Sequence, residues 1–345
     1  MRAVVYEQFG GELTVRDLDD PAPGADDAVV RVEATGLCRS DWHGWLGHDP
    51  DVEVPHVPGH EFAGVVAEVG SQVRGWAPGY RVTAPFVCGC GRCLPCLRGD
   101  HQVCEAQSQP GFTHGGSFAE YVLVRHADVN LVGLPDTLSA VTAASLGCRF
   151  ATAWRAVTRQ GRAAPGEWVA VHGCGGVGLS AVQVAAASGA RVVAVDVSAA
   201  ALALAAELGA EVCVDASAAD VVEAVRAATG GGAQLSLDAL GSPGTCVNSV
   251  RCLARRGRHV QVGLLPPAAG CPEVPMDVVV ARELELRGSH GMAAHAYPEL
   301  LALVTSGRLR PDALVRRRIG LQDVCAALPA MGEGGAAGIT VVDRL

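Results

Sequence analysis

The chain contains no lysine, because all 27 of its basic residues are arginines. Chemistry that needs a lysine amine, such as Schiff-base catalysis or the lysine of the Walker phosphate loop, is therefore excluded. Aromatic residues are also scarce, at 4% of the chain. Acidic residues outnumber basic ones, and the net charge of −9 argues against nucleic acid as a partner.

The sequence also lacks a basic head followed by an apolar run, and it has no apolar stretch long enough to span a membrane. We therefore expect a cytoplasmic protein with no membrane partner. The chain has 13 cysteines, and an odd number in a long chain favours reduced thiols and metal sites over disulfides. Its 345 residues suggest about two domains on the usual prior of ~150 residues each.

The densest feature of the sequence is a group of four cysteines in the stretch CGRCLPCLRGDHQVC. Two successive CxxC steps allow the thiolates to turn toward one point, and tetrahedral Zn²⁺ accepts four such ligands in a closed structural site. A chance cluster and a disulfide framework are the alternatives. Such a zinc site stabilises a lobe and does no chemistry, so the function must lie elsewhere. The four residues are Cys90, Cys93, Cys96 and Cys104.

The texture of the chain changes near its middle. Residues 1–150 contain short β segments divided by Gly- and Pro-rich turns, which is typical of a β domain. Residues 151–288 alternate apolar strands with Ala-rich helices, as in WVAVHG, LSAVQVAAASGA and RVVAVD, which predicts βαβ units of a parallel sheet. A helix in YPELLALVTSG and a strand in GITVVD are expected in the closing segment, residues 289–345.

A glycine-rich turn, GCGGVG, follows the predicted strand WVAVH directly and precedes a helix. Gly173, Gly175 and Gly178 have the GxGxxG spacing, and Asp196 ends the next strand about 20 residues later, where a carboxylate hydrogen-bonds the adenosine ribose. Asp196 would repel a 2′-phosphate, which favours NAD over NADP. The alternative is a glycine turn that packs on the sheet, with Asp196 as an ordinary helix N-cap.

Three further segments carry residues that can bind zinc. GLCRSDWHG contains Cys38, PGHEFAG contains His60, and LGCRFATAW contains Cys148. Taken singly, a cysteine among apolar residues is more often part of a core, and a lone histidine is more often a hydrogen-bonded loop residue.

Together, these motifs and their order resemble the zinc-dependent medium-chain alcohol dehydrogenases over essentially the full length of the chain. The resemblance implies an α/β protein with a Rossmann-type, doubly wound parallel sheet domain and a mostly β, GroES-like catalytic domain. It implies a catalytic domain in residues 1–150 with a zinc lobe at 88–105, a nucleotide-binding domain in residues 151–288, and a return of the chain to the catalytic domain in residues 289–345. It also implies a homo-oligomer, with a tetramer favoured over a dimer.

The resemblance assigns roles to individual residues. Cys38, His60 and Cys148 match the ligands of a catalytic zinc with an open fourth position, in addition to the structural zinc. Glu61 matches a catalytic glutamate that approaches this metal and can ligate it transiently. Ser40 matches the hydroxyl that takes the alcohol proton and passes it through the nicotinamide ribose toward His43; a helix-capping pair is the alternative. The expected cofactor contacts are Arg39, Thr152, Gly173, Gly175, Gly176, Val177, Gly178, Asp196, Val262 and Leu264.

The resulting prediction is a reversible, NAD-dependent dehydrogenase with two zinc ions per subunit, acting on a small-molecule alcohol or carbonyl compound. An apolar primary alcohol is favoured, because the expected pocket residues are apolar. A polyol or sugar-intermediate dehydrogenase and a non-catalytic NAD/zinc redox sensor are the alternatives.

Two features depart from the family pattern. Arg149 is bulky where small residues are common. GGAAGITVVD lacks a basic residue before the last strand, so that nucleotide affinity depends more on Arg39. The expected pocket residues are Trp42, Phe86, Phe150 and Leu264, with Trp45 beside them.

Overall fold

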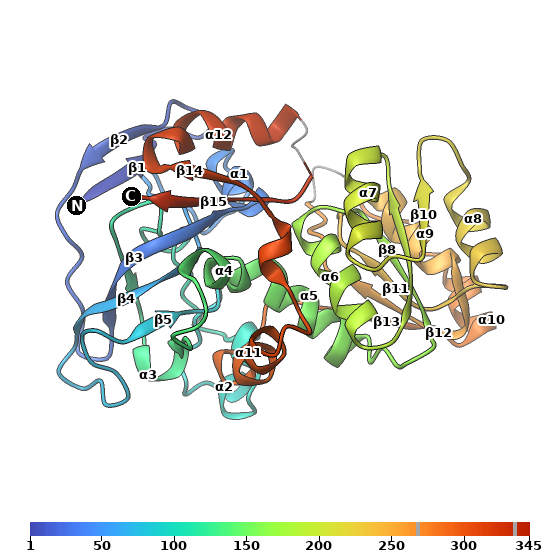
Figure 1. Ribbon diagram of the computed structural model, residues 1–345, viewed down its shortest axis with the longest axis horizontal. Helices are drawn as coiled ribbons and strands as arrows, with labels where there is room; N and C mark the ends of the chain where they lie inside the picture. Colours follow the sequence, from blue (N-terminus) through green and yellow to red (C-terminus); the bar gives the residue numbers. More distant parts are fainter. Residues whose placement is uncertain (267–269, 334–336) are drawn as a thin grey trace.

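The computed structural model describes residues 1–266, 270–333 and 337–345. It has two halves, each built on one large sheet (Figure 1). The amino-terminal and carboxy-terminal segments share one half, and the middle of the chain forms the other. Among the described residues, we find no helix that combines the length and apolar character needed to cross a bilayer.

The middle of the chain forms a six-stranded parallel sheet, as the alternation of strands and helices predicts. The strand order is β10-β9-β8-β11-β12-β13, so the chain moves outward in one direction from β8 and then in the other. This is the doubly wound order, which opens a crevice at the carboxyl ends of the strands where the direction reverses. The strands are β8 (Trp168–His172), β9 (Arg191–Asp196), β10 (Val212–Asp215), β11 (Ala233–Asp238), β12 (Leu253–Gln261) and β13 (Glu285–Gly288).

Helices cover both faces of this sheet. Because side chains alternate along a strand, Val169 and Val171 pack with Leu179 of one helix, whereas Ala170 of the same strand packs with Val225 on the opposite face. The expected Rossmann-type fold is therefore confirmed. The helices are α6 (Gly176–Ala187), α7 (Ala199–Glu207), α8 (Val221–Ala228), α9 (Pro243–Arg251) and α10 (Met276–Arg282).

The other half is built on a mainly antiparallel, seven-stranded sheet with the order β14-β15-β3-β4-β5-β7, and β6 pairs with β3. The last strand, β15, pairs with β3, so the end of the chain returns to the sheet formed by its beginning. A two-stranded sheet of β1 and β2 lies beside it. The strands are β1 (Arg2–Val5), β2 (Thr14–Asp17), β3 (Ala28–Leu37), β4 (Glu61–Val69), β5 (Arg81–Thr83), β6 (Tyr121–Val124), β7 (Val132–Gly133), β14 (Val315–Gly320) and β15 (Ile339–Arg344).

The helices of this half are mostly short, consistent with the expected β domain. The helix predicted in YPELLALVTSG is present as α11. The helices are α1 (Arg39–Trp45), α2 (Leu94–Leu97), α3 (Ala127–Asn130), α11 (Tyr297–Thr305) and α12 (Val324–Ala330), with short 3₁₀ turns at His101–Val103, Ala294–Ala296, Pro311–Leu314, Leu321–Asp323 and Met331–Glu333.

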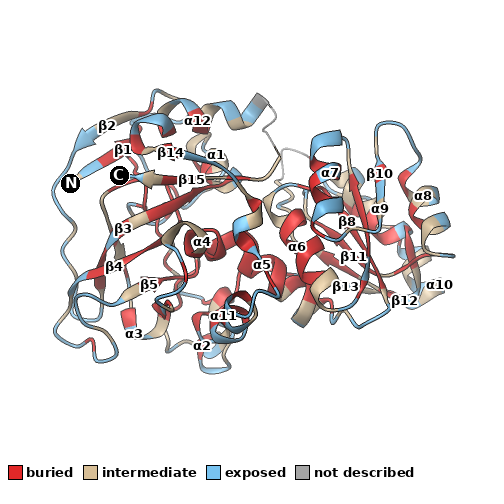
Figure 2. Cartoon of the chain, in the orientation of Figure 1, coloured by how far each residue is buried: buried red, intermediate tan, exposed pale blue. Residues whose placement is uncertain are grey.

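A helical stretch that the sequence did not predict joins the two halves. It consists of α4 (Ala140–Ala144), a π-helical segment η2 (Leu146–Phe150), α5 (Ala151–Arg155) and a second π-helical segment η3 (Ala156–Gln160). The stretch runs without a break through position 150, where the change in sequence pattern predicts a domain boundary. Figure 2 shows that α4, α5 and α6 are largely buried where the halves meet. One apolar core therefore runs from the seven-stranded sheet to α6, and the two halves are packed as one body.

Candidate active site

The four cysteines of the zinc lobe lie together. Their sulfur atoms are all within 4.8 Å of one another, and the thiols are free. Backbone N–H groups donate to two of these sulfurs: Cys93 N to Cys90 Sγ at 3.4 Å and Cys90 N to Cys104 Sγ at 3.3 Å. Backbone hydrogen bonds, from Arg92 first, lower the pKa of Cys90 to about 6, whereas burial raises the pKa of Cys96 to about 12 and also raises that of Cys104. Four cysteine sulfurs gathered at one point are the donor set of a closed tetrahedral zinc site.

A second cluster joins three segments that are far apart in sequence. Cys38 follows β3, His60 precedes β4, and Cys148 lies in η2, and all three are buried. Their ligand atoms, together with a carboxylate oxygen of Glu61, lie within 4.8 Å of one another. π-Helical turns occur frequently at functional sites, and this one carries Cys148 into the cluster.

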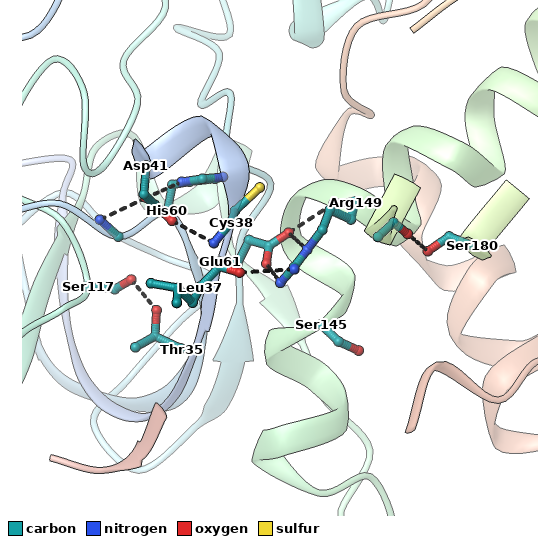
Figure 3. Close-up of polar contacts among 12 residues, drawn as sticks. Thr35, Leu37, Cys38, Asp41, His60, Glu61, Ser117, Ser145, Arg149 and Ser180 are labelled. Atoms are coloured by element: carbon teal, nitrogen blue, oxygen red, sulfur yellow. Dashed lines mark hydrogen bonds and ion pairs between the residues drawn. The ribbon is translucent and has the colours of Figure 1, made fainter. Parts of the chain in front are cut away.

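Asp41, which the sequence analysis did not single out, holds this cluster together. Its Oδ1 accepts from His60 Nδ1 at 2.7 Å and from Gly59 N at 3.1 Å, and its Oδ2 accepts from Cys38 N at 2.9 Å. The carboxylate thereby fixes the ring orientation of His60 and the start of α1 (Figure 3). Ligating histidines commonly donate their second ring N–H to such a carboxylate. The need of His60 for an acidic partner was therefore the signal by which Asp41 could have been found.

The cluster fits a metal ion by the chemistry of its atoms. His60 Nδ1 hydrogen-bonds to Asp41, whereas His60 Nε2 is buried and has no hydrogen-bond partner in the part of the chain that the structure describes. A hydrogen bond between the two thiols lowers the pKa of Cys38 well below its usual value and raises that of Cys148. An unpartnered imidazole nitrogen beside two thiol groups is a typical zinc ligand set.

Glu61 does not face this cluster freely, because Arg149 binds its carboxylate. Backbone N and Nε of Arg149 each donate to Glu61 Oε1 at 3.0 Å, and Nη2 donates to Oε2. Arg149 is 6% exposed and Glu61 is 0% exposed. Figure 3 shows Arg149 between Glu61 on one side and Ser180 of α6 on the other. The bulky side chain of Arg149 therefore forms a buried ion pair with Glu61 at the edge of the metal cluster.

Helix α1 carries the residues expected to move a proton. Ser40 and His43 lie three positions apart and therefore on the same helix face. His43 Nδ1 hydrogen-bonds to Nδ1 of His48, which is exposed, at 3.0 Å. The capping alternative does not apply to Ser40, because Cys38 is the N-cap residue and the side chain that bonds its N–H belongs to Asp41.

Arg39 contacts the closing segment of the chain and its own helix. Its guanidinium donates to the carbonyl of Met331 and lies 4.7 Å from the ring centroid of Trp42. Part of the segment that lacks a basic residue, residues 334–336, lies outside the described residues.

The glycine turn sits where the sheet reverses direction. Gly173 has a φ of +89°, and a Cβ there would lie 2.9 Å from Cβ of Leu240. A Cβ on Gly178 would lie 1.7 Å from the carbonyl oxygen of Gly173, so only glycine fits. A Cβ on Gly175, in contrast, would meet no described atom within 4 Å. This open backbone, at the N-terminus of the 12-residue helix α6, which begins with Gly176 and Val177, can receive a pyrophosphate.

Asp196 is the last residue of β9 and lies beside this turn. Its Oδ2 accepts from Cys174 N at 2.6 Å and its Oδ1 accepts from Ser198 N at 2.8 Å. The N-cap of α7 is Ser198, whose hydroxyl accepts from Ala201 N, so Asp196 is not an ordinary N-cap. The carboxylate is braced at the carboxyl end of β9, next to the glycine turn.

The other expected cofactor contacts lie near the same crevice. Thr152 is 7% exposed, and its hydroxyl has no partner in the described ranges. Val262 directly follows β12, and its N–H donates to Asp238 O at 3.0 Å. Leu264 is exposed, and a Cβ on the neighbouring Gly241 would lie 2.0 Å from the Leu264 carbonyl oxygen.

The expected pocket residues separate into two groups. Phe86 stacks edge-on against His60 with ring centroids 6.1 Å apart, and Trp42 does so against His43 at 5.0 Å. Phe150, in contrast, is 0% exposed and belongs to the main core, so its place in the pocket was a wrong expectation. The cause is the helical stretch at Ala140–Gln160, which the sequence analysis missed and which turns Phe150 inward. Trp45 Nε1 donates to Gly11 O, and Trp45 packs against a second core cluster.

Two aromatic groups near the metal cluster were not expected from sequence. Phe112 lies 5.1 Å from His60 between ring centroids, and His290 lies 5.2 Å from Phe86. They come from segments without a recognisable motif, so the sequence held no signal for either.

Comparison with known proteins agrees with this geometry. The model of the alcohol dehydrogenase GroES-like domain matches residues 24–136, and that of the zinc-binding dehydrogenase domain matches residues 176–306. An alcohol dehydrogenase from Rhizobium meliloti (strain 1021) is 35% identical over 99% of this chain and 98% of its own length. A sorbitol dehydrogenase from Halalkalibacterium halodurans is 30% identical over 97% of each chain.

A solved structure of similar fold supports the same grouping. It is described as a zinc-binding dehydrogenase from Sinorhizobium meliloti 1021 bound to NADP. It superposes with a TM-score of 0.89 at 34% identity and covers 99% of each chain. With both domain models matched and relatives similar over nearly the full length, the chain belongs to the zinc-dependent medium-chain alcohol dehydrogenase family.

Proposed function

We propose that the protein is a zinc-dependent alcohol dehydrogenase that transfers hydride reversibly between an alcohol and NAD. The observation that carries this proposal is the contact between the two candidate sites. Arg149 touches Glu61 of the metal cluster, and its Cδ would lie 2.4 Å from a Cβ on Gly176, the first residue of the dinucleotide helix. A substrate at the metal would therefore stand next to a dinucleotide in the crevice.

The residues present define how the metal would be held. Cys38, His60 and Cys148 would bind the catalytic zinc, and Cys90, Cys93, Cys96 and Cys104 the structural one, giving two per subunit. When bound at the first site, zinc supplies a Lewis acid that lowers the pKa of an alcohol. Asp41 holds the His60 ring so that Nε2 faces the cluster.

The chain also provides a path for the alcohol proton. In the proposal, Ser40 Oγ takes the alcohol proton while its own hydroxyl proton leaves toward His43, on the same face of α1. His43 then releases a proton to solvent beside His48. Burial, together with the charges of His48 and Arg39, lowers the pKa of His43, so its imidazole is neutral and able to accept a proton near neutral pH.

We assign the dinucleotide to the crevice above Gly175, with Thr152, Val262 and Leu264 on the nicotinamide side and Asp196 on the adenosine side. When bound, NAD supplies the hydride acceptor. The braced carboxylate of Asp196 favours NAD, because a 2′-phosphate would meet its charge. The similar structure from Sinorhizobium meliloti holds NADP, so the choice of cofactor has to be measured in this protein.

Phe86 and Phe112 lie against His60 of the metal cluster, and Trp42 lies against His43 of α1. These aromatic side chains favour an apolar primary alcohol. The similarity to a sorbitol dehydrogenase supports a polyol as the second candidate. The catalytic and nucleotide-binding domains are assigned to residues 1–150 with 289–345 and to 151–288. On the family resemblance we also propose a cytoplasmic homotetramer, whose mass light scattering would measure.

The test is formation of NADH or NADPH by the purified protein with two substrate sets, apolar primary alcohols and polyols, with and without a zinc chelator. Chelator-sensitive turnover with NAD and the apolar set supports the proposal. Turnover confined to polyols establishes the second candidate. Absence of turnover with every substrate, in protein shown to contain zinc, would contradict both and leave the non-catalytic sensor.

A further inference from the structure

Glu61 is a fourth potential metal ligand by position. It directly follows His60, and one of its carboxylate oxygens lies within 4.8 Å of the ligand atoms of Cys38, His60 and Cys148. The side chain is 0% exposed, so its charge must be balanced by a nearby cation rather than by water. Two cations are available to it: the metal, and the guanidinium of Arg149.

Arg149 occupies both carboxylate oxygens of Glu61. Oε1 accepts from the backbone N and from Nε of Arg149, each at 3.0 Å, and Oε2 accepts from Nη2. Such a paired arrangement of guanidinium and carboxylate is directional as well as strong. It holds both carboxylate oxygens against Arg149 of η2.

The guanidinium has further contacts that hold it in this position. Its Nη1 donates to the carbonyl of Leu37 at 3.0 Å, just before Cys38. A Cβ on Gly36 would lie 2.8 Å from Nη2, and one on Gly176 would lie 2.4 Å from Cδ. The absence of a side chain at Gly36 and at Gly176 therefore leaves room for Arg149.

On these contacts, and resting on the proposed function, we infer that Arg149 is a positioning residue that keeps Glu61 out of the coordination shell of the metal. The fourth position is thereby left open for substrate. Because the side chain of Arg149 also packs against Gly176 at the start of α6, the same residue ties the open metal position to the dinucleotide helix. Its role is separate from binding the metal or the substrate.

The test replaces zinc with Co²⁺, whose visible absorption reports its coordination. The variants are Arg149→Met, which keeps an apolar stem against Gly176, Glu61→Gln, and the double variant. Arg159→Met is the matched control, because it removes an Arg–Glu ion pair from the same helical stretch at the surface. The four-cysteine lobe contributes equally to every spectrum, so differences report the second site.

In Arg149→Met, the freed Glu61 should add a ligand to cobalt, and the visible bands should lose intensity as the geometry departs from tetrahedral. Added azide, which needs an open position, should then no longer shift the spectrum. The double variant should regain both the wild-type spectrum and the response to azide. Glu61→Gln and Arg159→Met should both resemble the wild type.

Two results would overturn the inference. One is an unchanged spectrum and azide response in Arg149→Met; the other is an altered spectrum in Glu61→Gln, which would mean that Glu61 already binds the metal. If neither single variant folds, the double variant, which removes both charges, serves as the test. A cobalt spectrum that differs from that of the wild type would then show that Glu61 is a metal ligand in the wild-type protein, which contradicts the inference. Wild-type protein that takes up cobalt only in the four-cysteine lobe would instead contradict the proposed function, and the inference with it.

Discussion

Asp41 and His60 form a fully buried carboxylate–imidazole pair, with Oδ1 of Asp41 2.7 Å from Nδ1 of His60. The pair leaves only Nε2 of His60 for another partner. We predict that Asp41→Asn weakens zinc binding at the second site about 10–100-fold, the usual cost of losing such a supporting carboxylate. Competition with a chromophoric chelator measures it. Asp51→Asn, in an exposed turn, is the control; equal zinc affinities of the two variants would contradict this role.

The two proposed zinc sites should respond differently to the loss of one ligand. Cys148→Ala should abolish turnover while the dissociation constant for NADH stays near wild type, because the nucleotide crevice is untouched. Metal analysis should find less zinc in this variant, and NADH fluorescence measures the binding. Substantial turnover in Cys148→Ala would remove Cys148 from the ligand set.

Cys104→Ala should instead lower the melting temperature, because the lobe that it closes has little core beyond its own cysteines. Zinc content should fall in this variant too. Cys88→Ala is the control, since Cys88 is a fully buried thiol outside both clusters. If Cys104→Ala keeps the wild-type zinc content and melting temperature, the structural site is wrongly assigned.

Asp196→Ala should shift selectivity toward NADP by about tenfold, equal to about 1.4 kcal/mol, because a fixed negative charge is removed from the adenosine side. The ratio of kcat/KM values for the two cofactors measures it. Asp215 offers a matched control, because it pairs in register with Asp196 on the neighbouring strand and also accepts locally, from the N–H and the hydroxyl of Ser217. Asp215→Ala should leave selectivity unchanged. Equal ratios in the two variants would exclude Asp196 from cofactor choice.

Gly175→Ala should weaken NADH binding by about tenfold, or about 1.4 kcal/mol. The added methyl group meets no described atom within 4 Å, and the φ of −76° suits alanine, so stability should change by less than about 1 kcal/mol. Fluorescence titration and thermal unfolding separate the two effects. Gly244→Ala, also in open space but on α9, should leave NADH affinity unchanged. An unaltered affinity in Gly175→Ala would place the pyrophosphate elsewhere.

Local patterns in the sequence predicted most of the fold. Alternating apolar strands and Ala-rich helices depend on backbone geometry over a few residues, and they led correctly to the doubly wound sheet. The helical stretch from Ala140 to Gln160 was missed, because π-helical turns interrupt the regular period that identifies a helix. Phe150 was placed in the pocket for the same reason, although it is buried in the core.

The sequence by itself determined the chemistry of the ligands. The spacing of Cys90, Cys93, Cys96 and Cys104, and the glycines of GCGGVG, specify local geometry that neighbouring residues build unaided. Only the tertiary structure decided which side chains surround the second metal cluster. Asp41 reaches His60 across 19 positions, and Arg149 reaches Glu61 across 88. Such contacts depend on how β3, β4 and η2 pack against one another, and no local pattern encodes that packing.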